Sequence, residues 1–115
     1  MTWRTVCPVS RVPSERGVCV LLDGQQVALF KTAAGTLHAI DNRDPVSGAM
    51  VLARGIVGTR GGRDVVTSPM YKQAFDLVTG ECLDKADTRV AVHEVAVHGG
   101  FLAVRLASAE ALRSA

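Results

Sequence analysis

Short apolar runs separated by glycine-containing turns dominate the pattern of hydrophobic and polar positions. Runs of this length, rich in β-branched residues, are typical of strands, and no helix-period segment of ordinary length competes with them. The predicted strands span residues 18–22, 26–30, 36–40, 56–60, 64–67, 74–78, 90–97 and 101–106. Three dipeptides, Asp23-Gly24, Gly61-Gly62 and Gly99-Gly100, lie between consecutive runs and predict hairpin turns, because glycine accepts the positive φ that tight primed turns require.

Two stretches do not fit a strand pattern and are predicted to be loops. Residues 41–54 carry Asn, Asp, Pro, Ser and Gly, and residues 68–73 begin with Ser-Pro. Irregular segments on a rigid scaffold often carry function, so we expect functional loops here. Residues 108–114 are compatible with a last helical turn or two.

Length and charge limit the possible functions. A chain of 115 residues is one domain, and its 48% hydrophobic content is enough for a core without disulfide or metal support. Lys+Arg 13 against Asp+Glu 11 is too balanced for binding a phosphate backbone, so nucleic acid is not an expected partner. No apolar stretch approaches a membrane span, and the N-terminus has no apolar core behind a basic start. We therefore expect a cytoplasmic protein that does not enter a membrane.

The cysteines and histidines do not suggest a metal site. Cys7, Cys19 and Cys82 are widely spaced and no histidine lies at metal-ligand spacing from them, so we expect reduced and mostly buried thiols. His93 and His98 are five residues apart in a predicted strand and should project from opposite faces. We expect each imidazole to be solvated or hydrogen-bonded.

The two predicted loops carry a family resemblance. His38-Ala-Ile-Asp-Asn-Arg-Asp-Pro-Val, followed by Leu52-Ala-Arg-Gly-Ile-Val and by Val65-Val-Thr-Ser-Pro-Met-Tyr-Lys-Gln-Ala-Phe-Asp-Leu-Val-Thr-Gly-Glu-Cys-Leu, resembles the cluster-binding region of a Rieske iron-sulfur domain. Such domains bind one iron through two cysteines and the other through two histidines, in a Cys-x-His and a Cys-x-x-His loop. The resemblance places these ligands at Asp44, Val46, Ser68 and Tyr71. Because valine has no donor atom and a serine hydroxyl replaces a thiolate poorly, we expect no [2Fe–2S] cluster and no other metal in this chain.

A narrower resemblance follows from the same loops. Asp-Pro in the first loop, Ser-Pro-Met-x-Lys-Gln-x-Phe in the second and a length near 115 residues are similar to the small subunit of assimilatory NAD(P)H-dependent nitrite reductase. This family resemblance implies a large-subunit partner that holds FAD, sirohaem and a [4Fe–4S] cluster and reduces nitrite to ammonium. The chain itself would be a non-catalytic subunit without a cofactor. The alternative is a cluster-less relative of Rieske-type ferredoxins that serves another oxygenase or reductase as an interaction module.

The pattern and the resemblance agree on the fold. We expect an all-β, Rieske-like antiparallel sandwich or barrel, a single domain over residues 1–115 in which residues 41–81 form a small inserted subdomain. Asp44 and Ser68, each before a proline, are expected to cap turns by accepting hydrogen bonds from nearby backbone N–H groups.

The tips of the two loops allow two interpretations. In the first, Val46, Met70 and Tyr71 fill the space of a cluster, and the loops pack on each other through apolar contact. In the second, the tips form an exposed apolar patch with a basic rim, a composition that suits a partner interface. The candidate partner-binding residues are Arg43, Val46, Met50, Arg54, Pro69, Met70, Tyr71 and Lys72.

Overall fold

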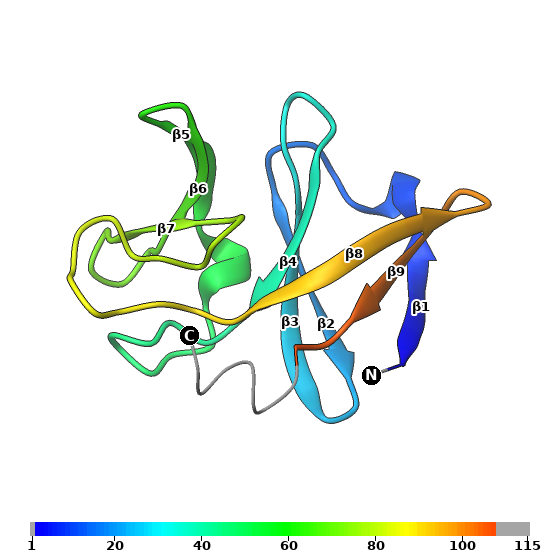
Figure 1. Ribbon diagram of the computed structural model, residues 1–115, viewed down its shortest axis with the longest axis horizontal. Helices are drawn as coiled ribbons and strands as arrows, with labels where there is room; N and C mark the ends of the chain where they lie inside the picture. Colours follow the sequence, from blue (N-terminus) through cyan, green and yellow to red (C-terminus); the bar gives the residue numbers. More distant parts are fainter. Residues whose placement is uncertain (1, 108–115) are drawn as a thin grey trace.

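The computed structural model describes residues 2–107, and the helical turn expected at residues 108–114 lies outside them. Within this described range, nine strands form two antiparallel sheets (Figure 1). The elements are β1 (Trp3–Pro8), η1 (Val9–Arg11), β2 (Gly17–Leu22), β3 (Gln25–Lys31), β4 (Leu37–Asp41), η2 (Leu52–Arg54), β5 (Ile56–Arg60), β6 (Arg63–Thr67), β7 (Ala74–Asp76), β8 (Val92–His98) and β9 (Phe101–Arg105), where η marks a short 3-10 helix. The predicted all-β class is confirmed.

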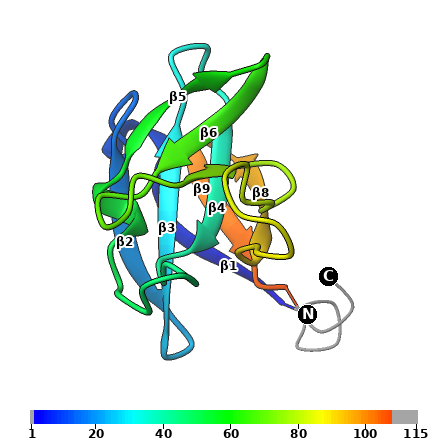
Figure 2. The same ribbon diagram turned by 90° about the vertical axis from the view of Figure 1, so that its left-hand side faces the viewer.

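The larger sheet has the strand order β1-β9-β8-β4-β3-β2 and bends over an apolar core. Its two halves, β1-β9-β8 and β2-β3-β4, are joined by the pairing of β4 with β8, at Ala39↔His93 and Ile40↔Val92. In Figure 2, β1 and β9 pass behind β3 and β4. Between them lies a buried cluster that consists of Val12, Val27, Leu29, Ala39, Leu102 and Val104.

The smaller sheet, β5-β6-β7, covers the opposite face of the β2-β3-β4 half. A second buried cluster fills this space and includes Phe30, Ile40, Leu52, Val66, Phe75 and Leu77. Strand β3 contributes to both clusters, since alternate residues of a strand point to opposite faces. This explains why β3 is a continuous apolar run rather than an alternating one.

The hairpins form at the predicted dipeptides. Both residues of Asp23-Gly24 have positive φ, 50° and 80°, as a type I′ turn requires, and the same holds at Gly61-Gly62 and Gly99-Gly100. Strand β1 was not predicted. It pairs with β9, from Trp3↔Arg105 to Pro8↔Phe101, with an irregularity between Thr5 and Cys7.

Other differences from the sequence analysis are local. Strand β7 ends at Asp76 instead of residue 78, because the Asp76 carboxylate accepts hydrogen bonds from Val78 N and Thr79 N and forms a turn there. The expectation of mostly buried thiols is wrong: Cys82 is buried, Cys7 is half-buried and Cys19 is exposed on β2. No helix within residues 2–107 is long and apolar enough to cross a membrane.

The two histidines of β8 differ in environment. His93 is buried, and its Nδ1 accepts a hydrogen bond from Ala107 N at 2.9 Å, so the proton lies on Nε2 and is donated to Asp41 Oδ1 at 2.7 Å. His98 is exposed. His93 is therefore a hydrogen-bonded core residue, as expected.

Candidate partner-binding site

The first predicted loop connects β4 to β5 and is closed at its base by Asn42. This buried side chain accepts a hydrogen bond from Ala53 N at 2.8 Å and donates one to Gln26 Oε1 at 2.9 Å. The backbone adds Leu52 N to Asn42 O at 3.0 Å. The two ends of the loop are thereby held together and fixed to β3.

Asp44 organises the tip of the first loop. Its Oδ1 accepts hydrogen bonds from Val46 N at 2.8 Å and Ser47 N at 3.3 Å. Two backbone bonds, Asp44 N to Ala49 O and Gly48 N to Asp44 O, close the turn. The predicted capping role of Asp44 is confirmed.

Ser68 has the corresponding role in the second loop, which connects β6 to β7. Its hydroxyl accepts a hydrogen bond from Met70 N at 3.2 Å, and its carbonyl accepts one from Lys72 N at 3.1 Å. Lys72 adopts a positive φ of 60°, which brings the chain back so that Ser68 N bonds Gln73 O. The predicted capping role of Ser68 is also confirmed.

The two loops are joined by a direct hydrogen bond between these two capping residues. Ser68 Oγ donates to Asp44 Oδ2 at 2.6 Å, and both side chains are buried. Burial raises the pKa of Asp44, but the hydrogen bonds from Ser68, Val46 and Ser47 outweigh it and hold this pKa below its ordinary value. The Asp44–Ser68 contact thus links the loops through a buried carboxylate.

Of the two interpretations of the loop tips, apolar packing between the loops is contradicted for two of the three residues. Tyr71 is 61% and Met70 45% exposed, so neither covers the space between the loops. Val46 is half-buried and packs on the core cluster of Phe30 and Leu52.

The other candidate partner-binding residues lie at the surface. Met50 is 41% exposed, and Arg43, Arg54, Pro69 and Lys72 are exposed as well. Both loops lie at the end of the molecule that carries the smaller sheet, on the left in Figure 1. The tips therefore combine exposed apolar side chains with cations on a hydrogen-bonded support.

Two carboxylates that the sequence analysis did not single out, Asp84 and Asp76, form ion pairs at this end of the molecule. Asp84 forms a bidentate ion pair with Arg60, at 2.6 and 2.9 Å, and accepts a hydrogen bond from Ala74 N. The Arg60 guanidinium and that backbone N–H lower the pKa of Asp84 to about 2. Asp76 bonds Arg63 at 2.6 Å. The charges are visible in the sequence, but their pairing across 13 to 24 positions is not.

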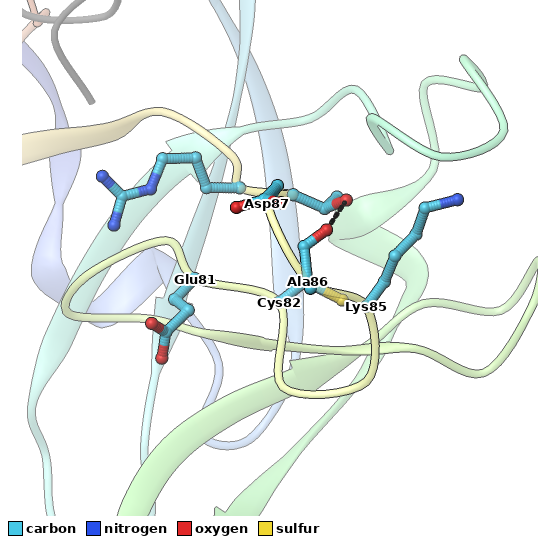
Figure 3. A pocket seen from close by; sticks show the side chains of 7 residues that line it. Glu81, Cys82, Lys85, Ala86 and Asp87 are labelled. Carbon is cyan, nitrogen blue, oxygen red and sulfur yellow. Dashed lines mark hydrogen bonds between the residues drawn. The ribbon is translucent and has the colours of Figure 1, made fainter.

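A hollow beside the smaller sheet has a volume of about 490 Å³. It is lined by Glu81, Cys82, Lys85, Ala86, Asp87, Thr88 and Arg89. Figure 3 shows that the Glu81 and Lys85 side chains point away from each other. Ligand sites need a few polar groups that converge on one point, so this hollow is not a candidate.

The donor atoms at the aligned positions do not fit a [2Fe–2S] cluster. The resemblance assigns the thiolate positions to Asp44 and Ser68 and the imidazole positions to Val46 and Tyr71. The side chains of Asp44 and Ser68 are hydrogen-bonded to each other. None of the four offers a thiolate or an imidazole. Within residues 2–107, no group of three or more His, Cys, Asp or Glu side chains is placed to hold a metal ion.

Comparison with known proteins identifies the class. A model of the family described as Rieske-like [2Fe-2S] domain matches residues 2–105. The chain therefore belongs to the Rieske-like domain family, and its relatives there include nitrite reductase small subunits. It is 35% identical over 104 residues to the nitrite reductase (NADH) small subunit of Escherichia coli K12, which covers 90% of this chain and 96% of that protein.

Solved structures agree with this placement. A crystal structure from Mycobacterium tuberculosis, assigned as an NADH-dependent nitrite reductase small subunit, is 49% identical with a TM-score of 0.87 and covers 93% of this chain and 97% of that one.

A further relative is longer: the nitrite reductase [NAD(P)H] large subunit of Klebsiella oxytoca is 36% identical over 98 residues. That match covers 85% of this chain but only 10% of the Klebsiella protein.

Proposed function

We propose that the chain is a non-redox small subunit of an NAD(P)H-dependent nitrite reductase and docks onto its large subunit. The Klebsiella relative carries this proposal, because a domain like this one makes up a tenth of a protein named as the large subunit. In Escherichia coli the similar protein is named as a separate small subunit. A domain that is covalently part of one partner in one organism and separate in another is expected to bind that partner, since fusion only raises the effective concentration of an existing contact.

The proposed docking surface is the pair of loop tips with their basic rim. Met70 and Tyr71 are large, adaptable or amphipathic side chains that gain most from desolvation by a partner. The buried Asp44–Ser68 contact holds the two tips together before binding, which reduces the entropy lost on association. Arg43, Arg54 and Lys72 supply the polar rim that surrounds such anchors.

The redox chemistry would belong to the partner. FAD, sirohaem and a [4Fe–4S] cluster in the large subunit would carry electrons from NAD(P)H to nitrite and form ammonium, in the cytoplasm and without nucleic acid or membrane. The donor set at Asp44, Val46, Ser68 and Tyr71 supports this division, because it holds none of the ligands of a Rieske centre. The alternative role, as an interaction module for another oxygenase or reductase, has weaker support, since relatives at 34% to 49% identity are nitrite reductase subunits.

Replacing Tyr71 by alanine tests the docking surface. Tyr71→Ala is expected to weaken binding to the large subunit by about 1 to 3 kcal/mol, as truncation of an interface anchor does, with an unchanged melting temperature. Titration calorimetry and thermal melting measure the two effects. Phe101→Ala is the matched control, since Phe101 is also an exposed aromatic residue but lies in the β8–β9 hairpin. Unchanged binding together with a lowered melting temperature would show that the tyrosine serves the fold alone.

A further inference from the structure

Strand β2 is an open edge of the larger sheet without the usual protection. It is the last strand in the order β1-β9-β8-β4-β3-β2, and its sequence, Gly-Val-Cys-Val-Leu-Leu, contains no charged residue and no proline. No residue of β2 is buried, whereas its neighbour β3 has four buried residues in a row. Natural edge strands are normally protected by charges, proline or a covering segment, so a bare apolar edge indicates a surface that a partner covers.

The hairpin geometry shows which backbone groups of β2 are free. A two-residue type I′ turn makes Leu22 and Gln25 a hydrogen-bonded pair, and hydrogen-bonded pairs then alternate along the strands. The N–H and C=O groups of Cys19 and Leu21 consequently point away from β3. Within residues 2–107 these groups form no backbone hydrogen bond.

Two hollows adjoin this edge on the side of the first loop. One has a volume of about 370 Å³ and lies between Cys19 and Ala53; the other, about 350 Å³, lies between Leu21 and Arg43. Both hollows are lined by Met50 and Gln26. Leu21 is 69% and Met50 41% exposed, so each hollow is bordered by at least one exposed apolar side chain. A strand added to β2 would have side chains of every second residue next to these hollows.

The charge beside the edge is positive. Arg16, Arg43 and Arg54 line hollows along β2 and form no ion pair within the described part of the chain. By contrast, Arg4, Arg60, Arg63 and Arg105 all have carboxylate partners. Two acidic residues line the same hollows: Glu15, which has no ion-pair partner there either, and Asp41, whose carboxylate is bonded to His93 and Gln25.

We infer that β2 binds an extended, acidic segment of the large subunit by strand addition. The main chain of that segment would pair with Cys19 and Leu21, its apolar side chains would enter the hollows beside Met50, and its carboxylates would meet Arg43 and Arg54. This inference rests on the proposed function for the identity of the partner. Strand addition at β2 would be a second contact with the large subunit, besides the contact at the loop tips. It would depend on backbone pairing instead of an aromatic anchor.

Hydrogen–deuterium exchange resolved to single residues tests the pairing directly. On adding the large subunit, the amides of Cys19 and Leu21 should exchange at least about tenfold more slowly, because their N–H groups become hydrogen-bonded. The amides of Val18 and Val20 already bond β3 and serve as internal controls. Equal exchange at Cys19 and Leu21 in the free and bound chain would overturn the inference. The inference would also be overturned if these amides exchange more slowly in the isolated chain as its concentration is raised, because β2 would then pair with a second copy.

Charge substitutions at the exposed Leu21 test the chemistry of the segment. Leu21→Glu should weaken binding by about tenfold relative to Leu21→Lys, because both variants lose the same apolar contact but only glutamate repels an acidic segment. Arg43→Glu should weaken binding similarly, and Arg11→Glu, in η1 beside the β8–β9 hairpin, should not. Equal binding by the two Leu21 variants would contradict an acidic partner segment.

Melting temperatures of these variants control for folding, and the wild-type chain separates the two proposals. If the wild type binds the large subunit and the β2 and Arg43 variants bind equally well, strand addition is wrong while the proposed function stands. If the wild type does not bind at all, the proposed function itself fails.

Discussion

At the scale of single residues, the Asp44–Ser68 contact is the central feature of the site. The two side chains occupy positions that the family resemblance assigns to cluster thiolates, and they join the same two loops by a hydrogen bond of 2.6 Å. A buried carboxylate is stable only when its oxygens are hydrogen-bonded, and Asp44 has donors on both. The contact therefore provides the link between the loops without iron.

Removing the donor of this contact should destabilise the domain. Ser68→Ala leaves Asp44 Oδ2 buried without its hydrogen bond, which is expected to cost about 1 to 3 kcal/mol of unfolding free energy. Chemical denaturation measures it. Ser10→Ala, at an exposed serine of η1, is the control and should stay within about 0.5 kcal/mol of the wild type. A Ser68→Ala variant as stable as the control would show that the contact contributes nothing to the fold.

The same carboxylate predicts a pH dependence. The pKa of Asp44 is lower in the folded chain than its ordinary value of 3.8, so its contribution to stability is complete above pH 3.8 and is lost as the pH falls through the folded-state pKa. Asp44→Asn should therefore lose less unfolding free energy than the wild type between pH 5 and about pH 2. The dependence is reduced and not abolished, because the pKa values of Asp76 and Asp84 are also lowered. Parallel stability profiles of variant and wild type in this range would contradict this assignment.

At the scale of elements, the position of η2 against β2 shapes the surface around the first loop. Gly17 begins β2, and a Cβ there would overlap the carbonyl oxygen of Ala53 and approach the Phe30 ring to 2.7 Å. Only glycine allows this close approach, and it lets the first loop lie directly on one face of the strand, away from its hydrogen-bonding edge.

Alanine substitution tests this packing. Gly17→Ala should lower the unfolding free energy by about 1 to 3 kcal/mol, because the added methyl group forces η2 away from β2. Gly58→Ala is the matched control, a strand glycine without positive φ and with no atom within 4 Å of the added Cβ. It should be neutral or slightly stabilising. Urea denaturation compares the unfolding free energies of the two variants. Equal unfolding free energies would mean that η2 does not pack closely against Gly17 of β2.

The elements differ in how well the sequence predicts them. The β2–β3 and β5–β6 hairpins were predicted because Asp23-Gly24 and Gly61-Gly62 encode the turn locally. Strand β1 was missed because its partner β9 is about a hundred residues away and its first half is exposed, so no local pattern marks it. The same applies to the site: each capping turn was predicted from Asp-Pro and Ser-Pro, but the hydrogen bond between the two turns depends on tertiary folding.

At the scale of the whole molecule, the smaller sheet and the two halves of the larger sheet form three layers. These layers expose two different candidate surfaces for a partner. The loop tips of the smaller sheet carry Met70 and Tyr71, and the middle layer exposes the edge of β2 beside the first loop. Two core clusters fill the spaces between the layers, so we expect the chain to fold without a metal at the loops. We propose that this fold serves as a docking scaffold for an enzyme whose redox groups lie in the partner.

Binding of the metal-free chain to the large subunit tests this account most directly. The chain is treated with a chelator, checked for the absence of iron and acid-labile sulfide, and titrated into the purified large subunit by calorimetry. The account predicts saturable binding with a negative heat-capacity change, as burial of apolar surface requires, and the same affinity before and after chelation. Stoichiometric iron in the untreated chain, together with loss of binding after chelation, would contradict it.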